Sequence, residues 1–136
     1  MLKAMEVYTL SSKDAFVTIS VDLKKSRIRI HRDTLHILGN PKYIQLLVDP
    51  EKMNVAVKAV DASIPGDQIH TVYQRIILSD NSYEIYSKAF IKKLYEINSE
   101  LDPKHSYRMS GKVLASHRVA VFSMKTLKQI VVSNGG

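Results

Sequence analysis

Short segments with alternating apolar and polar residues recur along this chain of 136 residues, and they constrain its fold more than any other feature. Residues 27–31 read RIRIH, so Ile28 and Ile30 share one face of an extended segment. A period of two residues is that of a β-strand with one buried face. The other segments of this kind are 16–21, 43–48, 53–60, 73–78, 83–86, 107–114 and 118–122. The sequence therefore predicts a mostly β fold.

Two short helices are expected between these strands, which makes the predicted class α+β. Asp33 stands where it can cap a helix that ends at Gly39, since aspartate accepts from free amides and glycine ends helices. Ser87 is placed in the same way before a predicted helix over residues 88–98. The predicted helices are too short and too few to change the mainly β character.

The two halves of the chain repeat one pattern. In both 15–60 and 73–124, a strand is followed by a short helix and then by a hairpin, with one more strand before them. Residues 61–72, which contain Pro65 and Gly66, are predicted to be the linker between the two repeats. A unit of this size is marginal for burying a core alone, so we expect both repeats to form one compact unit.

Charge and composition limit the classes of partner and the cellular locations to be considered. The net charge is +7 and the pI is about 9.6, which makes a polyanion such as nucleic acid the first partner to consider. The absence of cysteine excludes disulfides and thiol catalysis and argues for a reducing, cytoplasmic location. The chain has no run of 18 apolar residues and no signal-peptide pattern at its start, so no membrane association is expected.

Patterns typical of catalysis are missing from the sequence. The five histidines include no pair spaced four residues apart, and neither an HExxH nor a GxSxG motif occurs. The five glycines form no phosphate-binding loop. We therefore expect no enzymatic activity, no metal site and no organic cofactor.

The segment 24–32, KKSRIRIHR, is the strongest candidate for a binding site, because its nine positions contain no acidic residue. If Ile28 and Ile30 are buried, the period of the strand turns Arg27 and Arg29 outward together. Such a row can also protect a sheet edge from pairing with other chains. The corresponding stretch of the second repeat carries Glu84, so DNA binding is expected either on one side only or to have been lost altogether. The candidate residues are Lys24, Lys25, Arg27, Arg29 and Arg32.

The stretches VDLKKSRIRIHRDTLHILGN and YIQLLVDPEKMNVAVKAV resemble the DNA-binding domain of the AbrB/SpoVT/MazE family. The likeness follows individual residues over 15–60 but only the pattern over 73–124. This chain has His31 where the family usually has proline, and NPK at 40–42 where it usually has a Gly-Asp turn. The matching residues are Val21, Asp22, Arg27, Ile28, Ile30, Leu35, Leu38, Gly39, Ile44, Leu46, Val48, Val55 and Val57.

The resemblance implies a swapped-hairpin β-barrel, in which each repeat completes the sheet of the other. Two repeats in one chain, as in the tandem MraZ arrangement, would interlock as a pseudo-dimer. It also implies a transcription regulator that holds duplex DNA with the basic strand and loop of the first repeat. The alternative is a protein-binding module on the same fold, antitoxin-like or a phage-encoded scaffold, with an acidic protein as partner. Further homo-oligomerisation stays open.

Overall fold

The computed structural model of the chain describes residues 15–61, 68–78 and 80–130. Residues 62–67 of the predicted linker thus lie outside the description. The elements are β1 (Ala15–Asp22), β2 (Arg27–His31), α2 (Arg32–Ile37), β3 (Tyr43–Asp49), β4 (Asn54–Val60), β5 (Ile69–Thr71), α3 (Gln74–Leu78), β6 (Ser82–Tyr86), α4 (Lys88–Ile97), β7 (Ser106–Leu114), the 3₁₀ turn η1 (Ala115–His117) and β8 (Val119–Ile130).

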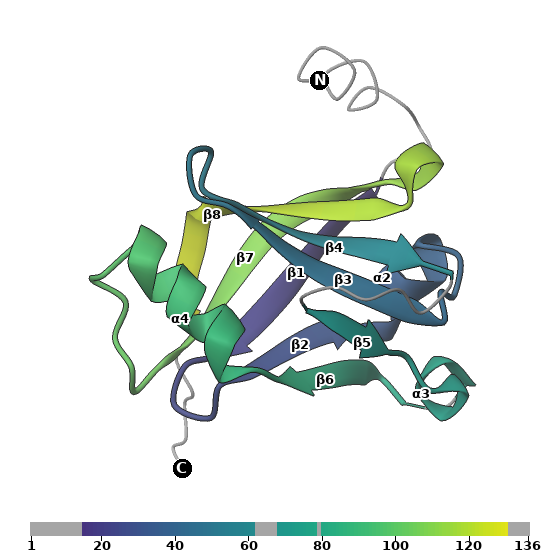
Figure 1. Ribbon diagram of the computed structural model, residues 1–136, viewed down its shortest axis with the longest axis horizontal. Helices are drawn as coiled ribbons and strands as arrows, with labels where there is room; N and C mark the ends of the chain where they lie inside the picture. The colour runs from purple at the N-terminus through teal and green to yellow at the C-terminus, as the bar shows by residue number, and fades with distance from the viewer. Residues whose placement is uncertain (1–14, 62–67, 79, 131–136) are drawn as a thin grey trace.

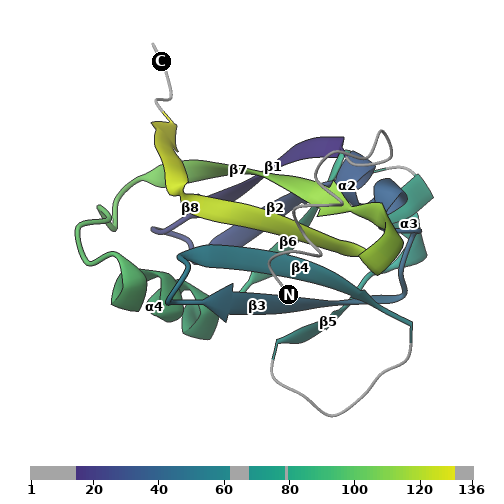
Figure 2. The same ribbon diagram turned by 90° about the horizontal axis from the view of Figure 1, so that it is seen from above.

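All eight strands belong to one antiparallel sheet in the order β5-β3-β4-β8-β7-β1-β2-β6. The sheet curls into a nearly closed barrel, in which the wall of β3 and β4 faces the wall of β1 and β2 (Figures 1 and 2). The edge strands β5 and β6 meet where the hydroxyl of Tyr83 donates to the carbonyl of Thr71 at 2.5 Å. The predicted mostly β class with short helices is therefore confirmed.

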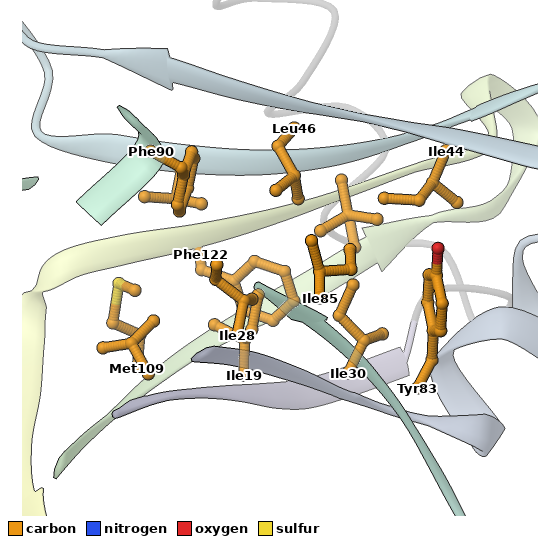
Figure 3. Packing of buried hydrophobic residues seen from close by; sticks show 14 of the residues in the cluster. Ile19, Ile28, Ile30, Ile44, Leu46, Tyr83, Ile85, Phe90, Met109 and Phe122 are labelled. Carbon is orange, nitrogen blue, oxygen red and sulfur yellow. The ribbon is translucent and has the colours of Figure 1, made fainter. Parts of the chain in front are cut away.

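The interior of the barrel is filled by aliphatic side chains. Ile28 and Ile30 are completely buried, as the alternation in β2 predicted. Ile44 and Leu46 of β3 point toward them from the opposite wall (Figure 3). Each such side chain contributes about 1.5–3 kcal/mol by leaving water. One continuous apolar cluster extends through the barrel and includes residues of both predicted repeats.

Helices close the two ends of the barrel (Figure 1). At one end, α4 begins as predicted, since the Ser87 hydroxyl accepts from the Phe90 amide at 3.1 Å. At the other end, the prediction that Asp33 caps α2 is wrong. His31 is the N-cap residue and makes no side-chain cap, and the Arg32 amide instead donates to the Asn81 carbonyl at 3.0 Å. No described helix has the length and apolar character needed to cross a membrane.

Two further details differ from the sequence-based expectation. Residues 74–78 form the helix α3 rather than a strand, with Ile76 buried. The short strand β5 lies inside the predicted linker and pairs with β3 through Ile44 and His70. Both segments are too short for hydrophobic periodicity to distinguish a strand from a helix, so tertiary contacts decide their conformation.

Candidate nucleic-acid interface

The turn between β1 and β2 displays two lysines. Leu23 is buried and its amide donates to the His105 carbonyl, while the Asp22 carboxylate accepts from the Lys25 amide at 3.1 Å. These contacts fix the turn and leave the side chains of Lys24 and Lys25 exposed. Within the part of the chain that the structure describes, neither lysine has a carboxylate partner. We call residues 23–26 the lysine turn. This turn presents two uncompensated positive charges.

The outward face of β2 carries Arg27 and Arg29, but both guanidinium groups contact carboxylates. Arg29 donates from Nε and Nη2 to one carboxylate oxygen of Glu84 on β6, at 3.0 and 2.7 Å. Arg27 lies 3.3 Å from Asp22 and 3.9 Å from the same Glu84 oxygen. Glu84 belongs to the second predicted repeat, and nothing in the sequence pattern indicates this contact. The arginine row is thus partly neutralised within the molecule.

Arg32 stands apart from the lysine turn. It follows β2 as the first residue of α2, whereas Lys24 and Lys25 precede that strand. Five extended residues separate the two groups by about 17 Å. The structure therefore brings Arg27 and Arg29 together with the turn and leaves Arg32 at the far end of β2.

The register of the sheet adds two cations that the sequence analysis missed. Arg29 pairs with Ser20 on β1, Ser20 with Arg108 on β7, and Arg108 with Lys128 on β8. Directly paired residues share one face of a sheet, so these side chains form a row on the outside of the barrel. Arg108 and Lys128 are exposed. We call Arg29, Ser20, Arg108 and Lys128 the outer row.

The sequence shows both residues, Arg108 and Lys128, but it does not show that they lie beside the basic strand β2 and its turn. Arg108 lies on a strand that was predicted, two positions from Ser106 and on the same face. Its place beside β1 depends on the strand order, which no periodicity reports. Lys128 belongs to the last part of β8, which extends to Ile130 and so is longer than the predicted strand 118–122.

Among the described residues, His70 and His105 contact polar side chains. Burial lowers the pKa of His70, whose Nε2 lies 2.9 Å from the Gln68 side-chain oxygen. His105 pairs with Asp102 at 3.2 Å on the surface. Among residues 15–61, 68–78 and 80–130, no group of three or more potential ligands that could hold a metal ion is present.

Comparison with protein-family models, with curated proteins and with solved structures finds no match to this chain.

Proposed function

We propose that the chain is a DNA-binding regulator of the AbrB-like type, folded as a pseudo-dimer within one chain. The pairing of the strands supports the interlocked arrangement. β1 of the first repeat pairs with β7 of the second. β5 lies in the predicted linker just before the second repeat, where it stands in place of the first strand predicted for that repeat, and it pairs with β3 of the first. Each repeat thus gives its first strand to the hairpin of the other repeat, which is the relationship expected of a swapped-hairpin barrel.

The registers of the two central ladders support the same symmetry. In β2–β6, Arg29 pairs with Glu84, and Ile28–Ile85 and Ile30–Tyr83 flank that pair on either side. In β4–β8, the Ala56–Val121 pair is flanked by Val55–Phe122 and Val57–Ala120. A pseudo-twofold axis through both central pairs would relate the flanking pairs to each other. Such an axis makes 15–60 and 73–124 equivalent repeats of one unit.

The two faces of this pseudo-dimer are unequal in charge. A symmetric dimer of the first repeat would bring Arg29 against a second Arg29, and like charges directly opposite each other destabilise a sheet. Glu84 replaces that repulsion by an ion pair. The lysine turn occurs in the first repeat, so the cationic surface lies on one side of the axis.

The observation that carries the DNA-binding proposal is the exposed lysine turn next to the arginines of β2 on one outer face. Lys24 and Lys25 would hold backbone phosphates, as point charges do, while Arg27 and Arg29 can fork onto phosphate or onto guanine. Exposed ion pairs contribute only about 0.2–1 kcal/mol. Exchange of Glu84 for a duplex phosphate is therefore inexpensive, and Arg32 extends the surface along the strand.

Replacement of both lysines tests this role. In the Lys24→Ala, Lys25→Ala variant we expect weaker binding to all duplexes alike and a salt dependence flatter by about 1.8 log units per log unit of salt. The matched control is Lys88→Ala with Lys92→Ala, which removes two exposed cations from α4. Fluorescence anisotropy with two unrelated duplexes measures both quantities. Equal effects of the two double variants would reject the lysine turn as the contact.

The second candidate is a protein-binding module with an acidic partner. The ion pairs of Asp22 with Arg27 and of Glu84 with Arg29 favour it, because the outer face already accommodates carboxylates. Binding of polyglutamate but not of duplex DNA at the same ionic strength would support this candidate against the first.

A further inference from the structure

A hollow of about 290 Å³ opens on the outer face beside the outer row. It lies where β1, β2 and β7 run side by side and the end of β8 adjoins them. Its lining combines three arginines with two serines, one aspartate and two aliphatic residues. The lining residues are Ser20, Val21, Asp22, Arg27, Arg29, Ser106, Arg108 and Ile130.

Two arginines flank this hollow symmetrically. Arg29 and Arg108 pair with Ser20 from opposite sides, each one strand away. Neighbouring strands lie about 4.8 Å apart, so the two backbones are separated by about 10 Å with only a serine between them. Long guanidinium side chains can cover that gap and converge above Ser20.

The charges around the hollow are not balanced. Arg27 is paired with Asp22 and Arg29 with Glu84. Arg108 has no carboxylate partner among the described residues, although it is exposed and lines the hollow. The hollow therefore retains a positive charge that an anion from outside can neutralise.

The donors suit a phosphate group better than a carboxylate. Guanidinium forks and serine hydroxyls approach this hollow from three different strands. A phosphate group offers several strong acceptor oxygens in a tetrahedral arrangement and can accept from all of them, whereas a planar carboxylate is matched by a single fork.

We propose that this hollow binds one phosphate group, with Arg29 and Arg108 as its main ligands and the hydroxyls of Ser20 and Ser106 as further donors. The inference rests on the proposed function in one respect only, because it takes the phosphate to belong to the nucleic-acid backbone. A free phosphoester has the same chemistry and would occupy the same hollow. A DNA strand that crosses from the lysine turn to Arg108 would place a phosphate here.

Pyrophosphate is the probe for the hollow itself. In ¹H–¹⁵N spectra of the full chain, a pyrophosphate titration is expected to shift the amides of Ser20, Ser106 and Arg108. Arg108→Gln should weaken this binding at least about tenfold, and Arg108→Lys should restore it only in part, because lysine keeps the charge but lacks the fork. Lys125→Gln removes an exposed cation of β8 outside the hollow and should change nothing.

Duplex DNA is the second arm of the test. If the backbone supplies the phosphate, Arg108→Gln reduces the salt slope of duplex binding by about 0.9, as the loss of one phosphate contact requires. Pyrophosphate binding that depends on Arg108, without any duplex binding, supports the hollow as a phosphoester site and rejects the proposed function. Duplex binding that Arg108→Gln leaves unchanged, with no pyrophosphate shifts, overturns the hollow and leaves the proposed function standing.

Discussion

Arg29 on β2 and Glu84 on β6 are direct partners across the sheet, and the guanidinium group donates twice to one oxygen of the carboxylate, at 3.0 and 2.7 Å. This pair stands at the centre of the β2–β6 ladder. It joins strands of the two predicted repeats and, at the same time, pairs an arginine that the proposed function assigns to DNA. The proposed function therefore links assembly and DNA binding through one carboxylate.

Removal of the Glu84 charge tests whether this carboxylate competes with DNA for Arg29. In Glu84→Gln, Arg29 and Arg27 lose their shared carboxylate, so we expect duplex binding to become roughly fivefold tighter, since an exposed ion pair contributes up to about 1 kcal/mol. The salt slope should stay unchanged, because Arg29 contacts a duplex phosphate in both proteins once Glu84 has been displaced. Fluorescence anisotropy at two ionic strengths measures both quantities. Glu96→Gln, the same change of charge at an exposed position of α4, is the control. Weaker duplex binding by Glu84→Gln than by Glu96→Gln would show that the Arg29–Glu84 ion pair helps to hold the DNA-binding surface in place and does not compete with DNA for Arg29.

The interlocked pairing predicts how the chain behaves when it is divided. Fragments 1–64 and 65–136 each separate their first strand from a partner in the other half, since β1 pairs with β7 as well as with β2, and β5 pairs with β3. Homodimers would place arginine against arginine, or glutamate against glutamate, at the centre of β2–β6. We expect that neither fragment alone gives a cooperative melting curve by circular dichroism. An equimolar mixture of the two fragments should give one. A native-like melt of a single fragment would contradict the interlocked arrangement.

Tyr83 on β6 joins the two edge strands by its hydrogen bond to Thr71 on β5. We expect the free energy of unfolding to decrease at alkaline pH, where this phenol ionises. Burial raises the pKa of Tyr83 to about 12, from 10.0 for a free phenol. The pKa of Tyr83 is higher in the folded than in the unfolded chain. The contribution of the neutral, buried phenol to the free energy of unfolding is therefore complete below pH 10 and declines as the pH rises toward 12. At pH 8, Tyr83→Phe should be less stable by about 1 kcal/mol through loss of the hydrogen bond to Thr71.

Urea denaturation at pH 8 and pH 11 measures the comparison between wild type and Tyr83→Phe. We expect the difference in unfolding free energy to narrow at the higher pH, because only the wild type has this phenol to ionise. A difference that stays constant across the two pH values would show that Tyr83 ionises equally in the folded and unfolded states.

β7 and β8 approach each other closely at Gly111. A Cβ at this position would lie 1.9 Å from the carbonyl oxygen of Val121, which is backbone and cannot turn away. Gly111→Ala should therefore destabilise the fold by about 3 kcal/mol or more through forced separation of β7 and β8. Ser110→Ala, an exposed change at the preceding position, is the control in chemical denaturation. Similar midpoints for the two variants would refute this packing argument.

Alternation in the sequence was sufficient to predict most of the sheet. The buried faces of β1 and β2, the Ser87 cap and the hairpin of β7 and β8 are local features, each determined by neighbours within a few residues. Segments of three to five residues, such as β5 and α3, carry too few side chains for a period to be recognised. Their conformation depends on contacts with β3 and α2, which are distant in the sequence.

The candidate site could be predicted only in part for a similar reason. The sequence indicated that Arg27 and Arg29 face outward and that Lys24 and Lys25 precede them. It could not place Glu84 opposite Arg29, because pairing between strands 55 residues apart follows from the topology. The position of Arg108 beside Ser20, and that of Lys128 beside Arg108, depend on the strand order in the same way.

The most direct test of the central claim is the salt dependence of duplex binding by the intact chain. With four or five phosphate contacts from the basic strand and turn, we predict that a fourfold increase in salt weakens binding by about two to three decades. Anisotropy titrations of a labelled random duplex at 50 mM and 200 mM salt measure this change. The absence of salt-dependent duplex binding at the lower ionic strength would contradict the account and assign the basic face to another partner.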